Sequence, residues 1–144
     1  MLRQNIDGLA LRKSIELGDD AWEARIVGAR HCLSLLERGN STEEINEELW
    51  ELRHRQYHEA LISACNSPWM LYISDMLSDQ FDRYRRMSSK SSLLAQLNIL
   101  QHQEITDAAL DRKADLAVRL MNDHIKLATD HITTLLALQD KTSE

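Results

Sequence analysis

Four of the six histidines could supply nitrogen ligands to one metal ion. His54 and His58 lie four residues apart in ELRHRQYHEAL, which reads as an amphipathic helix, so they share one face about 5–6 Å apart. His102 and His124 lie 22 residues apart, on opposite sides of a predicted turn near 111–113. At about 1.5 Å per residue, these two reach nearly the same height on adjacent antiparallel helices. All four could therefore meet at one level of the core.

Such a cluster of imidazole nitrogens suits Zn²⁺, Ni²⁺, Cu²⁺ or Fe²⁺ and leaves room for water or a substrate oxygen. The spacing alone leaves a second interpretation open, in which the four histidines are hydrogen-bonded residues of an ordinary helical core. His31 and His131 are interpreted in that structural way. His131 lies two turns beyond His124, about 10 Å away, which is too far for both to bind one ion.

Catalytic metal motifs fit this sequence poorly. HRQYH has the histidine spacing of a zinc peptidase, but Arg55 stands where the general-base glutamate should be. Glu51 and His54 form one Glu-x-x-His motif, whereas a ferritin-like di-iron site needs two copies and two further glutamates. The sequence has no nucleophile elbow, phosphate-binding loop or dinucleotide fingerprint. We therefore predict that the protein is not an enzyme.

Composition indicates a chain built from helices. The 144 residues include one proline and four glycines, with 43% hydrophobic and 28% charged residues, which suits one all-α domain spanning 1–144. No run of 18 apolar residues could span a membrane, and the N-terminus lacks the apolar stretch of a signal peptide. Cys32 and Cys65 are interpreted as buried, reduced thiols, so we expect a cytoplasmic protein. The net charge of −6 argues against bulk attraction of nucleic acid.

Capping signals divide the chain into helices joined by short connections. Asp20 marks one helix start, Ser41 with Glu44 forms a capping box for another, and Ser67 with Pro68 marks a third. The predicted helices cover 2–17, 20–38, about 42–65, 68–87, 92–111 and about 112–138, with Gly18 and Gly39 as C-terminal caps and Asp111 as a candidate N-cap. Because short connections place neighbours side by side, we expect an antiparallel bundle.

Three stretches, in this order, resemble a known family: LRQNIDGLALRKSIELG, RHRQYHEALISACNSPWM and QHQEITDAALDRKADLAVRLMNDHI. They are similar to the FCD domain, the C-terminal effector-binding domain of FadR-type GntR transcriptional regulators. The most specific parts are the pair Tyr57–His58 followed by Asn66 and Pro68, and the 22-residue step between the last two cluster histidines. The resemblance covers nearly the whole chain. It implies an antiparallel bundle of six or seven helices with a central polar cavity and a divalent metal, often zinc.

By this resemblance His58, His102 and His124 are metal ligands. The family's fourth ligand is an aspartate four residues before the first histidine, and this chain has His54 there. We expect His54 to bind the metal, most simply zinc, with nickel or another transition metal as alternatives. Because imidazole is neutral, the site would keep the full charge of the ion, which favours an anionic effector. In the alternative, His54 turns away and metal binding is weakened.

The family also has an arginine early in its first helix that faces the cavity and pairs with an effector carboxylate. Arg3 matches that position, and a guanidinium group binds carboxylate through two parallel hydrogen bonds. Arg53, Arg83 and Arg86 are further candidates for effector binding, although helical periodicity does not fix their direction. Asn66 is expected to be a structural residue at a helix end.

The sequence thus predicts a domain that senses a small organic acid and supplies a homodimer interface. The family's N-terminal winged helix-turn-helix domain is absent from this chain, so operator DNA would be bound only through that missing domain. Two alternatives stay open. One is a histidine-rich helical-bundle metalloprotein, such as a hemerythrin-like metal or oxygen binder, and the other is a purely structural interaction bundle.

Overall fold

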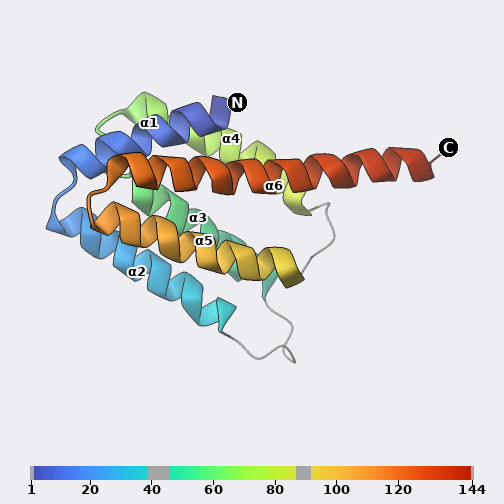
Figure 1. The fold of residues 1–144 in the computed structure, drawn as a ribbon, viewed down its shortest axis with the longest axis horizontal. Helices are drawn as coiled ribbons and strands as arrows, with labels where there is room; N and C mark the ends of the chain where they lie inside the picture. The colour runs from blue at the N-terminus through green and yellow to red at the C-terminus, as the bar shows by residue number, and fades with distance from the viewer. Residues whose placement is uncertain (1, 39–45, 87–91, 144) are drawn as a thin grey trace.

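Six helices make up the part of the chain that the structure, a computed structural model, describes: residues 2–38, 46–86 and 92–143 (Figure 1). They are α1 (Leu2–Leu17), α2 (Asp20–Glu37), α3 (Glu47–Ile62), α4 (Pro68–Arg86), α5 (Ser92–Leu110) and α6 (Ala114–Thr142). The described residues contain no strand, so the prediction of an all-α bundle is confirmed. None of these helices has both the length and the hydropathy needed to cross a membrane.

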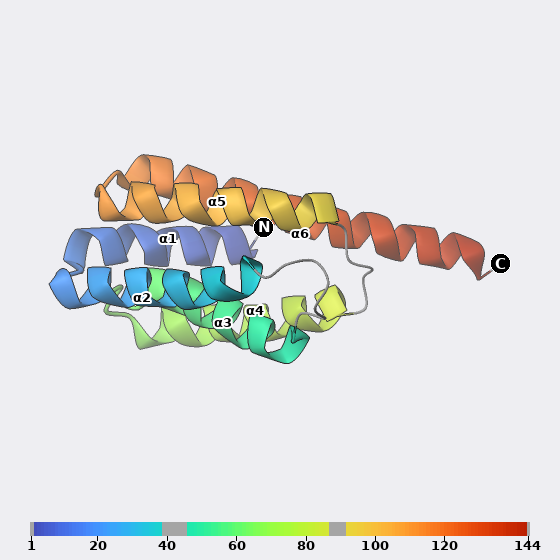
Figure 2. The same cartoon turned by 90° about the horizontal axis from the view of Figure 1, so that it is seen from below.

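The helices pack as an antiparallel bundle. α1 lies against α6, α4 and α3, while α2 lies against α3 and α5, and α5 packs along α6 (Figures 1 and 2). α6 is the longest helix, with 29 residues, and its C-terminal end extends past the other helices. This topology places α3, α5 and α6, which carry the four histidines, around one interior region.

The core is mostly apolar, but hydrogen bonds of a buried tyrosine link α3 to α5. Tyr57 is fully buried, and its hydroxyl lies 2.8 Å from both the His102 carbonyl oxygen and Thr106 Oγ1. Because a buried hydroxyl needs a partner, this contact fixes the register of α3 against the turn of α5 that carries His102. The largest fully buried side chains around it are Leu11, Ile26, Leu33, Leu61, Ile105 and Met121.

Two helix starts show how far capping chemistry could be predicted. At the start of α4, Ser67 Oγ accepts the Met70 N–H at 3.3 Å, as predicted. The cap of α2 is Asp19 and not Asp20, because Asp19 is the carboxylate in register with the Trp22 N–H, at 3.1 Å. The predicted helix start at Asp20 is confirmed, with the cap supplied by the residue before it.

The start of α3 was predicted too early. The helix begins at Glu47, where the Asn46 side chain accepts the Leu49 N–H at 3.1 Å. Asn46 therefore provides the N-cap. The predicted capping box of Ser41 and Glu44 lies outside the described residues, as do Gly39 and most of the predicted loop at 88–92.

Two helix ends use left-handed residues other than glycine. Asn66 has a φ of 56°, which supports its interpretation as a structural residue after α3. Arg112 has a φ of 60°, and the N–H groups of Arg112 and Lys113 bond to the carbonyls of Ala109 and Ala108. This is a Schellman motif, which usually carries glycine. The absence of that glycine explains why the boundary between α5 and α6 was hard to predict.

Further expectations about single residues need correction. Asp111 does not cap α6, because the preceding turn puts Lys113 at the N-cap position, and the helix continues to Thr142. Cys65 is buried as predicted, but Cys32 is exposed. Cys32 lies on the exposed face of α2, next to the exposed His31.

Gly18 is required by close packing between α1 and α2. A Cβ at this position would lie 2.6 Å from the Ser14 carbonyl oxygen and would overlap the indole of Trp22. Trp22 cannot easily move, because it is buried and its Nε1 donates to the Leu61 carbonyl oxygen at 3.2 Å.

We predict that Gly18→Ala lowers the free energy of unfolding by about 1–3 kcal/mol, the usual cost of overpacking. Urea unfolding followed by circular dichroism would measure this cost. Gly28→Ala is the matched control, because a Cβ at this exposed position in α2 would have nothing within 4 Å. That control should raise the stability by about 0.5–1 kcal/mol. Equal stability of the two variants would contradict the prediction.

Candidate metal centre

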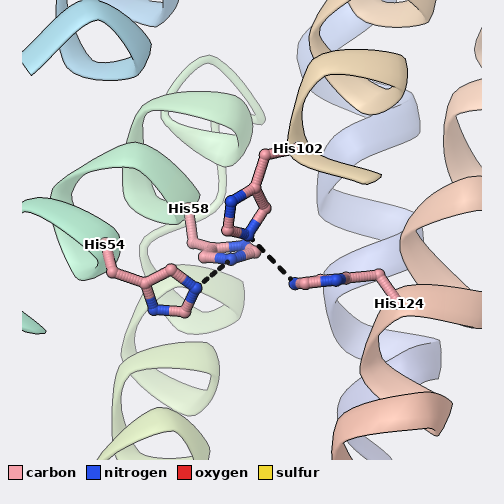
Figure 3. Close-up of side chains that lie close together, drawn as sticks. All are labelled: His54, His58, His102 and His124. Carbon is pink, nitrogen blue, oxygen red and sulfur yellow. Dashed lines mark hydrogen bonds between the residues drawn. The ribbon is translucent and has the colours of Figure 1, made fainter. Parts of the chain in front are cut away.

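The structure brings the four histidines of the predicted cluster together (Figure 3). His54 and His58 project from α3, His102 from α5 and His124 from α6. One nitrogen from each ring lies within 4.8 Å of the corresponding nitrogen of every other ring. Convergence at one level of the core, predicted from helical rise alone, is thus confirmed.

The spacing of these nitrogens fits a shared ion. His54 Nε2 and His58 Nε2 are 3.1 Å apart, and His102 Nε2 and His124 Nε2 are 3.2 Å apart. Zinc–nitrogen bonds of about 2.0–2.1 Å in a tetrahedron place neighbouring nitrogens about 3.3–3.4 Å apart. Both short separations are close to that value, so the donor set fits a divalent transition metal.

The outer nitrogens of two rings also favour metal binding. His124 Nδ1 lies 2.8 Å from Gln101 Oε1, which can only accept, so His124 carries its proton on Nδ1 and leaves the Nε2 lone pair facing the cluster. His102 Nδ1 faces the carboxylate of Glu37 at 3.7 Å, too long for a hydrogen bond. A carboxylate behind the outer nitrogen is the usual support of a metal-binding histidine.

Burial keeps the rings in their neutral, metal-binding form. It lowers the pKa of His58 and His124 well below the ordinary value, and repulsion from His102 adds to the effect. The pKa of His54 is likewise lowered well below normal, first by burial and then by the neighbouring imidazoles. Burial also lowers the pKa of His102, although Glu37 opposes this shift.

A polar cavity of about 350 Å³ opens beside the cluster. His54 and His58 form part of its wall, and Arg3 of α1 lies on the same wall. Arg3 Nε lies 3.3 Å from Asp7 Oδ2, and its guanidinium stacks over the Phe81 ring at 4.6 Å. A cavity that joins the imidazoles to a guanidinium group is large enough for a small organic molecule.

Charges on the cavity wall are nearly balanced. The wall includes three arginines and four carboxylates: Arg3, Arg25, Arg55, Asp7, Glu59, Asp75 and Asp82. Burial raises the pKa of Asp7 and of Asp82. The side chains alone therefore give no strong positive field, and a bound divalent cation would set the sign of the potential.

Three arginines named from the sequence lie away from this cavity. Arg53 Nη1 donates to the Cys32 carbonyl oxygen at 2.9 Å, and Arg86, with 65% of its side chain exposed, pairs with Glu51 at 2.7 Å. Arg83 is exposed near the end of α4. None of the three lines the cavity. The structure thus brings only Arg3, of the four proposed effector-binding arginines, to the site.

Sequence reasoning missed Arg85. Its Nη1 lies 3.1 Å from His54 Nδ1, between the two candidates Arg83 and Arg86 in sequence. Arg85 follows the buried Ser74 by 11 residues, which is about three helical turns and therefore the same face of α4. This relation could have identified Arg85 only if the buried face of α4 had been known, and the sequence did not reveal which face of that helix is buried.

The other two histidines are not part of the cluster. His31 is exposed. His131 is half-buried, and its Nε2 has no hydrogen-bond partner within the described part of the chain.

The chain is similar to a known domain family and to curated proteins. A family model of the FCD domain matches residues 1–127. An uncharacterized HTH-type transcriptional regulator, BphR of Paraburkholderia xenovorans, is 38% identical over 118 residues, which cover 81% of this chain and 48% of that protein. The HTH-type transcriptional repressor GlaR of Escherichia coli is 33% identical over 128 residues, covering 85% of this chain and 57% of the relative. The chain thus spans about half the length of these curated relatives. No solved structure matches it significantly.

The lowered pKa values predict that the metal-free chain loses stability in acid. Unfolded histidines take up protons near pH 6.5, whereas the buried rings stay neutral, so below that pH the unfolded state binds more protons. The free energy of unfolding should fall by about 1.4 kcal/mol per pH unit for each such ring. Urea unfolding in a chelator at pH 7.5, 6.5 and 5.5 would measure the slope.

His124→Gln should make this slope shallower, and substitution of the exposed His31 by glutamine should leave it unchanged. Asp7 and Asp82 have raised pKa values, which make the free energy of unfolding rise as the pH falls. Both variants keep these two residues, so the difference between the slopes of the two variants does not contain their contribution. Equal slopes for wild type and His124→Gln would count against neutral, buried imidazoles.

Proposed function

The chain belongs to the FCD domain family, and on that premise we propose that it is the effector-sensing domain of a GntR-type transcriptional regulator. The proposal includes a divalent metal at the histidine cluster and a small organic acid as the effector. The observation that carries it is the convergence of four imidazole nitrogens within 4.8 Å of one another beside a polar cavity.

His58, His102 and His124 are the proposed ligands, with zinc as the metal that best suits nitrogen donors at this spacing. A bound divalent cation would supply positive charge and a coordination position for an effector oxygen. His124 contributes a lone pair whose direction is fixed by Gln101. The hemerythrin-like alternative would need carboxylate ligands, and the described groups that meet here are all imidazoles.

Arg3 is the proposed anchor for an effector carboxylate. It lies on the cavity wall with His58, and it already holds one carboxylate, that of Asp7. Asp7 in turn accepts a hydrogen bond from the buried Ser74 hydroxyl, which holds the Asp7 carboxylate in place. That carboxylate then fixes the position of the Arg3 guanidinium through Nε. Guanidinium and carboxylate groups match in shape and charge, which favours organic acids over neutral ligands.

The proposed regulation is a shift between two arrangements of the bundle. The relatives extend well beyond the part that this chain matches and are described as HTH-type regulators, so we propose that a DNA-binding domain outside this chain contacts the operator. A homodimer would match the two-fold symmetry of a palindromic site. An effector changes DNA binding only to the extent that it binds one arrangement more tightly than the other.

Metal binding tests the first half of the proposal. We expect the chelator-treated chain to bind one zinc ion per chain in isothermal titration calorimetry, and elemental analysis should give the same ratio. His102→Ala should weaken zinc binding at least 100-fold, because the site loses one ligand. His131→Ala is the control and should bind zinc as wild type does. A folded wild-type chain without affinity for zinc, nickel or cobalt would disprove the metal site.

Substitution of Arg3 tests the effector half. In a calorimetric panel of small carboxylic acids, the zinc-loaded Arg3→Gln chain should bind the best acid about tenfold more weakly than wild type, the equivalent of about 1.4 kcal/mol. Its zinc content should not change. Arg12→Gln is the matched control on α1, since Arg12 pairs with the exposed Asp115 outside the cavity. Equal acid affinity in all three chains would contradict this role.

A further inference from the structure

The hydrogen bonds around His54 have a fixed direction. Arg85 Nη1 lies 3.1 Å from His54 Nδ1. A guanidinium group only donates hydrogen bonds and stays protonated, so His54 Nδ1 must be the acceptor. A neutral imidazole whose Nδ1 accepts carries its proton on Nε2. His54 therefore presents an N–H group, and not a lone pair, to the cluster.

Arg85 is held in this position by groups of α3 and α4. Its Nη2 lies 3.1 Å from Asp82 Oδ1 and 3.3 Å from Glu51 Oε1, and its guanidinium stacks over the Trp50 ring at 4.8 Å. Trp50 also stacks on His54, with ring centroids 4.6 Å apart and planes inclined by 13°. Two carboxylates and an indole thus fix the donor against the His54 ring, which makes the opposite tautomer unfavourable.

The other side of the His54 ring faces His58. The two Nε2 atoms are 3.1 Å apart, so the His54 N–H donates to the lone pair of His58. That lone pair is also the one that His58 would use to bind a metal ion. A His58 bound to metal could no longer accept this hydrogen bond, and the N–H of His54, on the cavity wall, would then need another acceptor.

We propose that His54 is not a metal ligand but a hydrogen-bond donor to an anionic oxygen at the metal site, and that Arg85 is the positioning residue that fixes its tautomer. This inference rests on the proposed function and replaces our expectation that His54 binds the metal. His58, His102 and His124 then form a three-nitrogen site with an open position. A carboxylate oxygen there receives a charge-assisted hydrogen bond from His54 Nε2–H.

The assignment accounts for the change from aspartate to histidine in chemical terms. A carboxylate at this position would be a negatively charged ligand that can only accept hydrogen bonds. His54, held by Arg85, is a neutral group that donates one to the same point. An aspartate at this position would reduce the positive charge of the bound ion, whereas His54 leaves that charge unchanged and favours an anionic effector.

Nuclear magnetic resonance of the chain with ¹⁵N-labelled histidine tests the tautomer directly. Long-range ¹H–¹⁵N spectra of the metal-free protein above pH 7.5 should show His54 protonated on Nε2 and His124 protonated on Nδ1. Arg85→Met should shift His54 toward the Nδ1–H form, whereas Arg83→Met, an exposed change on the same helix, should not. A wild-type His54 protonated on Nδ1 would overturn the proposal without any variant.

Metal binding separates this inference from the function on which it rests. His54→Ala should still bind one Zn²⁺ per chain, within about tenfold of the wild-type affinity, whereas His58→Ala should lose at least 100-fold. Acetate titrated into the Co²⁺-loaded chain, followed by visible absorption, should bind His54→Ala about tenfold more weakly than wild type. His54→Gln, whose amide can donate, should recover part of this loss.

Two outcomes would overturn the inference in different ways. Loss of zinc from His54→Ala equal to that from His58→Ala would make His54 a ligand and leave the proposed function intact. A wild-type chain that binds no metal would overturn the proposed function, and with it the role of His54 toward a metal-bound oxygen.

Discussion

The packing of four imidazoles at the meeting point of α3, α5 and α6, two of them buried and two half-buried, is the constraint around which this interior is organised. A polar ring removed from water must find hydrogen-bond partners or a metal ion. The outer nitrogens of three of the rings have different partners or neighbours: Gln101 for His124, Glu37 for His102 and Arg85 for His54. These differences give otherwise identical side chains different hydrogen-bonding directions.

The carboxylate that faces His102 is itself buried and paired. Glu37, which faces His102, is also 3.2 Å from Arg30, and both side chains are less than one-tenth exposed. Arg30 in turn lies over the Tyr57 ring at 6.0 Å, next to the hydroxyl that fixes α3 against α5. A buried charge that lost its partner would cost several kcal/mol, so this chain of contacts stabilises one register of the helices.

The sequence predicted those features that depend on helical geometry alone. His102 and His124 meet because rise per residue is constant and the turn between them was placed correctly to within a few residues. Ser67 was identified as a cap because its chemistry is local. Arg85 was missed because its importance depends on which way α4 faces, and that is decided by packing against α1 and α3. The cap of α6 was assigned wrongly to Asp111, because the turn at Arg112 lacks the glycine that usually marks such a helix end.

The length of α6 has a mechanical consequence. The helix continues without a break from His124 to Thr142, about 27 Å, and its far end extends past its neighbours (Figure 1). A continuous helix behaves as a stiff lever, so a tilt of about 5° at the histidine would move the tip by about 2 Å. Any tilt of α6 at the level of the imidazoles would therefore produce its largest displacement at the far end of this helix.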